Sequence, residues 1–151
     1  MKQTREHAET LCAPGSGTVR CLGGASYAID FFDEENGDVV SPVGGVVTHI
    51  GSGGNRISIC SQKGTSVSVG IGLPRPGRMN TADGCHYYVQ EGDAVHVGQR
   101  LMHAQLSHIR RMGGTSECVM TLDSGEDIRA SVDGGSTVRA GITPFLRLGE
   151  D

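Results

Sequence analysis

The chain has 151 residues, a formal net charge of −4 and no tryptophan. This length suffices for one ordinary domain with its own core. The sequence contains no run of about 18 apolar residues, so it predicts no membrane insertion. The acidic balance gives no electrostatic reason to expect nucleic acid as a partner.

The N-terminal segment MKQTREHAETLCAPG lacks the apolar stretch of a secretory signal. The chain also has an odd number of cysteines and no CxxC pair; they are Cys12, Cys21, Cys60, Cys85 and Cys118. Without a signal, such cysteines are typical of reduced thiols. The sequence therefore predicts a cytoplasmic protein.

In chain order, residues 1–10 are expected to form an N-terminal extension, with one or two helical turns over 4–10. Short alternating strands follow, separated by Gly, Asp and Asn turns. The predicted strands are 17–22, 27–32, 44–50, 56–60, 65–71, 85–89, 99–105, 118–122 and 143–148. DEENGD (33–38) is read as an acidic turn ending in Asn-Gly, and GSGGN (51–55) as a loop.

One better helix is predicted over 107–113. Ser107 would be its N-cap, and Arg110 and Arg111 would lie near the negative end of its dipole. Gly113 and Gly114 would end it. The two arginines are read as a solvated helix end. Since period-two patterning dominates elsewhere, we expect an all-β antiparallel sandwich or barrel with one or two short helices.

Two pairs of segments echo each other. LCAPGSGTV (11–19) resembles VVSPVGGVV (39–47), and EGDAVHVGQRL (91–101) resembles GGSTVRAGITPFLRL (134–148). The echoes are too few for a solenoid. They indicate a two-fold arrangement of similar hairpin units within one domain.

These segments, in this order, resemble the glucose-family enzyme IIA domain of the bacterial sugar phosphotransferase system. LCAPGSGTV is similar to its APxSG strand, VVSPVGGVVTHI to its APVDG strand and VQEGDAVHVGQRL to its EEGxxVKxGDxL hairpin. The resemblance covers roughly residues 11–148. It implies the duplicated hybrid motif fold and a single EIIA-like domain over 11–151.

In that family two histidines on paired strands carry and support a phosphoryl group. The match of NRISICSQKGTSVSVGIG to those strands places Asn55 at the first histidine and Gly70 at the second. Neither residue can accept a phosphoryl group. The sequence therefore predicts a vestigial phosphoryl site, no catalytic residue there, and a chain that is not an enzyme.

SYAIDFFDEENGDVVSPVGGVV also looks like the opening of lysostaphin-type zinc endopeptidases. Asp30 matches their metal motif, but Ser26 stands where a histidine belongs. Their later His-x-His would fall near Cys118 and Met120, which are not a pair of imidazoles. We therefore expect neither bound zinc nor another cofactor.

Three functions remain open. The first is a non-catalytic EIIA-like domain that binds protein partners as a regulatory or structural subunit, either alone or as part of a larger assembly. The second is a phosphocarrier that uses a displaced histidine, and the third is a degenerate metallopeptidase-like domain. For the first, the candidate partner-binding residues are Arg56, Ile71, Leu73, Arg75 and Arg78. A histidine placed at Gly70 would be expected to obstruct the partner and leave the fold nearly intact.

For the other two functions, the candidate histidines for holding phosphate or metal are His86, His103 and His108, with Cys85 beside the first. Surface or half-buried imidazoles without such a role are the commoner case.

Overall fold

The computed structural model describes residues 9–51, 55–72, 84–123 and 128–149. Its largest sheet has eight strands, in the order β13 (Thr137–Val138), β2 (Gly17–Gly23), β3 (Ser26–Phe31), β11 (Cys118–Leu122), β7 (Ser66–Ile71), β6 (Asn55–Ser61), β5 (Gly45–Ile50) and β9 (Ala94–Val95). Two sheets have three strands each. One is β4 (Asn36–Val40), β10 (Arg100–Gln105) and β8 (Cys85–Tyr87); the other is β1 (Glu9–Cys12), β14 (Pro144–Leu148) and β12 (Ile128–Ser131).

Every strand pairing in these sheets is antiparallel, and the one described helix is short, α1 (Leu106–Arg111). The predicted all-β class is confirmed. Among the described residues, no helix is both long and apolar enough to cross a membrane.

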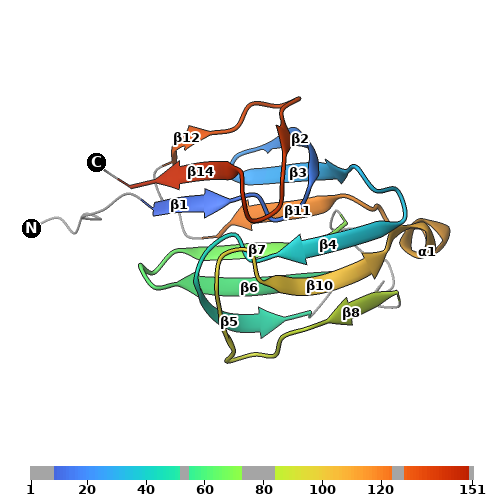
Figure 1. The fold of residues 1–151 in the computed structure, drawn as a ribbon, viewed down its shortest axis with the longest axis horizontal. Helices are drawn as coiled ribbons and strands as arrows, with labels where there is room; N and C mark the ends of the chain where they lie inside the picture. The colour runs from blue at the N-terminus through green and yellow to red at the C-terminus, as the bar shows by residue number, and fades with distance from the viewer. Residues whose placement is uncertain (1–8, 52–54, 73–83, 124–127, 150–151) are drawn as a thin grey trace, which may run out of the picture.

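The two small sheets lie side by side on one face of the large sheet (Figure 1). Alternate residues of the longer strands of the large sheet point into the space between them and are buried, as Ile57 and Ile59 of β6 show. Met102 of β10 and Leu146 of β14 join the same apolar cluster from the small sheets. This one core fixes which face of each strand can carry chemistry.

The two halves of the sequence, which carry the echoing segments 11–19 and 39–47, are joined by reciprocal backbone hydrogen bonds. The Cys12 amide donates to the Pro42 carbonyl at 2.8 Å, and the Val40 amide donates to the Pro14 carbonyl at 2.8 Å. Each half thus uses its Pro turn to bind the strand that precedes the other turn. The predicted two-fold arrangement is confirmed.

The second echo lies at the same junction. The Gly98 amide donates to the Ser41 carbonyl, and the Gly141 amide donates to the Ala13 carbonyl, both at 2.8 Å. Both glycines have positive φ, and a Cβ added to Gly141 would lie 2.8 Å from the Gly98 Cα. The pattern Gly-x-x-Val-x-x-Gly, at 92–98 and again at 135–141, supplies the two glycines that meet here.

Two local predictions were wrong. The segment DEENGD is not one turn, because Asn36 and Gly37 already belong to β4. Asp33 makes the turn instead, since its Oδ1 accepts the amides of Glu35 at 2.8 Å and Asn36 at 3.0 Å. A Cβ at Gly37 would lie 2.8 Å from the Leu106 Cδ2, so glycine serves packing there.

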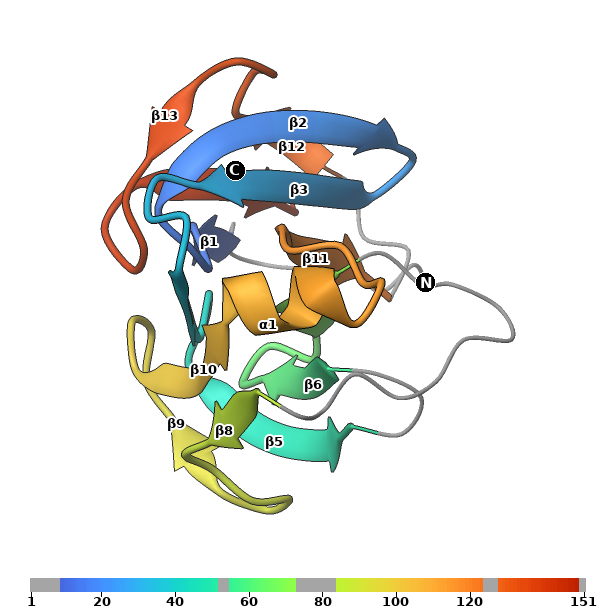
Figure 2. The same cartoon turned by 90° about the vertical axis from the view of Figure 1, so that its right-hand side faces the viewer.

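The helix also begins earlier than predicted. Gln105 holds the N-cap position without a side-chain hydrogen bond, and Ser107 lies inside the helix. Figure 2 shows α1 directly after β10, at the end of the small sheet that carries β4 and β8. At the N-terminus, Glu9 and Thr10 form the start of β1, whereas the rest of the expected helix at 4–10 lies outside the described residues.

Candidate functional site

Gly70 lies in β7 directly opposite Arg56 of β6. A Cβ built on Gly70 would collide with the backbone carbonyl oxygen of Asn55. No side chain fits at residue 70 unless the backbone moves. The expectation that a histidine at this position leaves the fold nearly intact is therefore wrong.

Asn55 and Gly70 lie on opposite faces of the large sheet. Asn55 is 2% exposed and alternates with Ile57 on the core side. Gly70 alternates instead with Val69 and Ile71, which are core residues, so it belongs to the outer face. In this structure the two positions do not form a facing pair.

The residues predicted to bind a partner are only partly accessible. Arg56 is half-buried on the outer face, and burial lowers the pKa of its guanidinium, while Asp123 and Cys118 act in the opposite direction. Ile71 is 4% exposed and belongs to the core, so it is not offered to a partner. Leu73, Arg75 and Arg78 lie outside the described residues.

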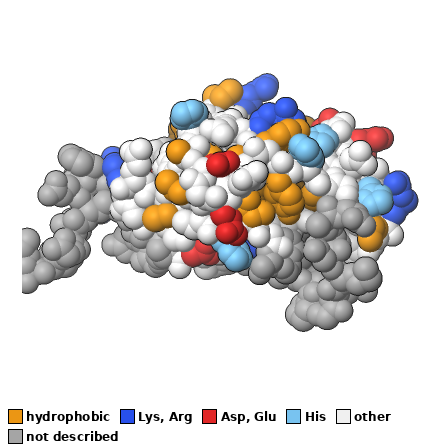
Figure 3. Space-filling model, turned by 90° about the horizontal axis from the view of Figure 1, so that it is seen from below, with side chains coloured by type: hydrophobic (Ala, Val, Ile, Leu, Met, Phe, Trp, Pro, Cys, Tyr) orange, Lys and Arg blue, Asp and Glu red, His pale blue; other side chains and the backbone are white. Residues whose placement is uncertain are grey.

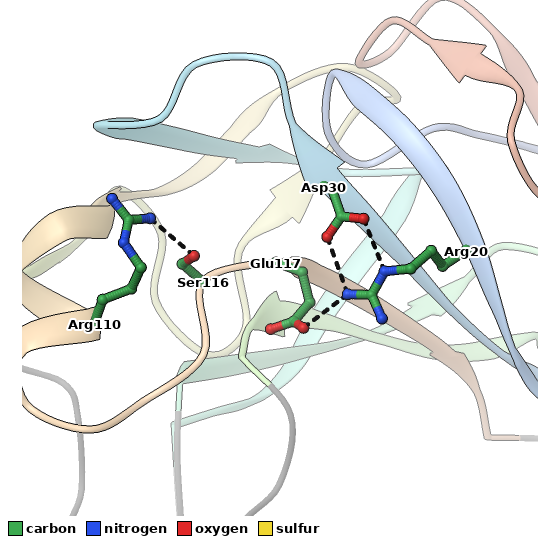
Figure 4. Close-up of polar contacts among 5 residues, drawn as sticks. All are labelled: Arg20, Asp30, Arg110, Ser116 and Glu117. Carbon is green, nitrogen blue, oxygen red and sulfur yellow. Dashed lines mark hydrogen bonds and ion pairs between the residues drawn. The ribbon is translucent and has the colours of Figure 1, made fainter.

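A second group on the outer face is an arginine held between two carboxylates (Figure 4). Arg20 donates from Nε to Asp30 Oδ2 at 2.8 Å and from Nη2 to Asp30 Oδ1 at 3.0 Å. Its Nη2 also donates to Glu117 Oε2 at 2.9 Å, although the Glu117 side chain is only 8% exposed. These bonds raise the pKa of Arg20. The group joins β2, β3 and the start of β11.

This arrangement does not support the metallopeptidase reading. Both oxygens of Asp30 already accept from Arg20, and the Ser26 hydroxyl is 3.0 Å from the Thr121 hydroxyl. Cys118 and Met120 point into the core on the opposite face. Within the described ranges, no three His, Cys, Asp or Glu side chains are placed to share a metal ion.

The histidine with the closest carboxylate partner lies on the small sheet of β4, β10 and β8. His103 of β10 has Asp38 of β4 as its partner on one side and His86 of β8 on the other. Its Nδ1 is 2.8 Å from Asp38 Oδ1. The buried neighbours Met102 and Ala104 point inward, so these three side chains share the outer face.

The Asp38 carboxylate fixes how the His103 ring can act. A carboxylate oxygen accepts hydrogen bonds, so in the tautomer that bonds Asp38 the proton is on Nδ1 and the lone pair is at Nε2. The His103 side chain is 25% exposed. This imidazole is oriented and reachable from solvent, which are the two properties of a nucleophilic histidine.

The remaining described histidines lack such a partner at hydrogen-bond distance. His49 Nδ1 is 3.7 Å from Glu91 Oε2, and His86 stacks edge-on against Tyr88 with ring centroids 4.7 Å apart. His108 packs near Gly84.

Figure 3 shows histidine, acidic, basic and hydrophobic side chains mixed over the face seen from below, so no one charge dominates it.

Comparison with known proteins decides the family. The model of the family "phosphoenolpyruvate-dependent sugar phosphotransferase system, EIIA 1" matches residues 21–128. The chain belongs to this family. The EIIA chain is 28% identical over 160 residues to the glucose-specific EIIA component of Bacillus anthracis, covering 96% of this chain and 93% of that protein.

Two further relatives extend the comparison. The EIIA chain is 36% identical over 120 residues to the beta-glucoside-specific EIIBCA component of Bacillus subtilis, a match that covers 70% of this chain and 18% of that protein. The solved glucose permease IIA of Mycoplasma capricolum has the same fold, with a TM-score of 0.70 and 18% identity. That match covers 97% of this chain and 99% of the solved one.

Family membership corrects one prediction. The absence of histidine at residues 55 and 70 predicted that the chain is not an enzyme. Its relatives are components of a phosphotransferase system, whose EIIA members pass on phosphoryl groups. That prediction was wrong, because it rested on one pair of positions alone, whereas the chain belongs to a phosphotransferase family.

Proposed function

We propose that this EIIA domain is a phosphocarrier that accepts its phosphoryl group on His103. The observation that carries the proposal is the 2.8 Å contact between His103 Nδ1 and Asp38 Oδ1 on the outer face of a small sheet. Among the described histidines, His103 alone has a ring nitrogen held by a carboxylate at hydrogen-bond distance. Membership of a phosphotransferase family supplies the reaction class.

The proposed step needs no co-reactant beyond the donor. His103 Nε2 attacks the phosphorus of a phosphohistidine on an upstream protein. One N–P bond forms while the donor's N–P bond breaks, and the donor imidazole leaves with the electron pair. The Nδ1 proton stays between His103 and Asp38, which stabilises the charge that the ring gains as the new bond forms.

The proposal includes a protein partner, because the donor must dock against the outer face of β4, β10 and β8. This face lies across the core from Gly70, so the docking surface would differ from the paired strands β6 and β7. We further propose a cytoplasmic location, which the five free cysteines support. That residues 11–151 form one domain stays a prediction.

Labelling tests the proposal. The protein is incubated with labelled phosphoenolpyruvate and the upstream phosphocarrier proteins. We expect acid-labile label on the wild type, none on His103→Gln, and full label on the control His86→Gln. His86 is the cross-strand neighbour of His103 and is exposed, so its loss should not disturb the fold. Absence of label from the wild type, or label retained by His103→Gln, would refute the proposal.

A further inference from the structure

Arg100 shares one oxygen of Asp38 with His103. The Arg100 Nη2 donates to Asp38 Oδ1 at 3.1 Å, and His103 Nδ1 meets the same oxygen at 2.8 Å. Asp38 Oδ1 is thus within hydrogen-bond distance of both the Arg100 guanidinium and the His103 ring. A carboxylate so paired is held in one orientation.

Arg100 is itself fixed by Tyr88. Its Nη2 also donates to the Tyr88 hydroxyl at 3.0 Å, and its guanidinium carbon lies 4.6 Å from the centre of the Tyr88 ring. A planar guanidinium can make both contacts at once, which the ammonium of a lysine cannot. The Arg100 side chain is 56% exposed and still has a defined position.

We infer that Arg100 is a positioning residue for His103, acting through Asp38. By holding the Asp38 carboxylate directed at Nδ1, Arg100 favours the tautomer with the ring proton on Nδ1 and the lone pair on Nε2. The inference rests on the proposed role of His103 in phosphoryl transfer. It adds that the fixed tautomer, rather than the imidazole alone, sets the rate of transfer.

The tautomer can be measured without any transfer reaction. Nitrogen-15 NMR of the unphosphorylated protein reports which ring nitrogen of neutral His103 carries the proton. We expect the Nδ1-protonated form in the wild type and a mixture in Arg100→Gln. Arg100→Lys keeps the charge but not both contacts with Tyr88, so it should restore the wild-type signal only in part. Arg129→Gln, an exposed arginine on β12, is the matched control and should change nothing.

The same variants are then labelled as above. We expect Arg100→Gln to slow label uptake about tenfold or more, the usual scale for losing an outer contact to a reactive group, with a melting temperature like that of Arg129→Gln. An unchanged tautomer in Arg100→Gln overturns the inference about Arg100, and so does an unchanged rate. A wild type that takes no label overturns only the proposed function, because the tautomer measurement still decides on Arg100.

Discussion

The Cys118 thiol is buried in the core and is not accessible to solvent. Burial in the core raises its pKa to about 12, with Arg56 acting in the opposite direction. Cys21, by contrast, is exposed on β2. Since the thiolate is the nucleophile, a buried and protonated thiol is inert.

Alkylation of the folded protein should therefore separate these two cysteines. At pH 10 we expect iodoacetamide to modify Cys21 within minutes and to leave Cys118 unmodified, because the pKa of Cys118 stays above that pH. Mass spectrometry of the peptides measures both sites, and a sample unfolded in urea gives the fully modified control. Equal modification of both sites in the folded protein would contradict the burial of Cys118.

Single residues were predictable from the sequence where alternation alone decides their face. Alternation places Ile57 and Ile59 on the side opposite Arg56, and both are fully buried in the core. The same rule applied to Val67, Val69 and Ile71 would have placed Ile71 in the core. We instead read Ile71 as a partner contact because of its place in the family's site. For Ile71 the resemblance to the family was given more weight than the alternation of apolar residues. The structure agrees with the alternation.

At the scale of elements, α1 is tied to its surroundings by Arg110. Its Nη1 donates to the Ser116 hydroxyl at 3.0 Å (Figure 4), and its Nη2 donates to the Glu34 carbonyl at 2.8 Å. The predicted solvated helix end thus holds the β3–β4 connection and the segment before β11. Arg111, the next residue, is exposed and makes no hydrogen bond of this kind within the described part of the chain.

The two arginines form a matched pair of variants. We expect Arg110→Ala to lower the free energy of unfolding by about 1 kcal/mol, the usual net contribution of such hydrogen bonds. Arg111→Ala should change it by less than about 0.5 kcal/mol. Urea denaturation measures both values. If the two variants are equally stable, the bonds of Arg110 do not stabilise α1.

Most of the longer strands could be predicted, because each has alternating apolar residues between turn residues. β4 could not be, since Asn-Gly is a strong turn signal and hid the strand in which it lies. That error also concealed Asp38, which was read as part of a turn and not as a strand residue facing His103. Arg100 and Tyr88 have no sequence signal of their own, because their roles come from the pairing of β10 with its neighbours.

For the whole molecule, the junction of the two halves depends on Gly98 and Gly141. A methyl group on Gly141 would lie 2.8 Å from the Gly98 Cα, and φ at Gly141 is +72°. Alanine there must tolerate both an unfavourable backbone conformation and a close contact between the halves.

We expect Gly141→Ala to destabilise the fold by about 1–3 kcal/mol more than Gly92→Ala does. Gly92 is the control because its φ is +94° and nothing lies within 4 Å of its added Cβ. Gly92→Ala therefore measures the cost of the unfavourable backbone conformation alone. Denaturation curves of both variants give the difference. Equal losses of stability would show that the halves can separate slightly at no cost.

The fold of the whole molecule was accessible from the sequence because its duplicated segments follow a known order. The face that performs chemistry was not, because it depends on which strands pair. Histidines at 86 and 103 could be named from the sequence as candidates, but only the register of β10 with β4 and β8 shows that they share a row with Asp38.

The pairing of β1 with β14 also bears on how the protein is made. Glu9 lies opposite Leu148, so the strand that pairs with the first described strand is the last one. During synthesis β1 can therefore form its strand pairing only after β14 has been made. Such long-range closure is slow. Until β14 leaves the ribosome, the nascent chain exposes the edge of β1, and a chaperone that covers strand edges would have its longest contact with this protein then.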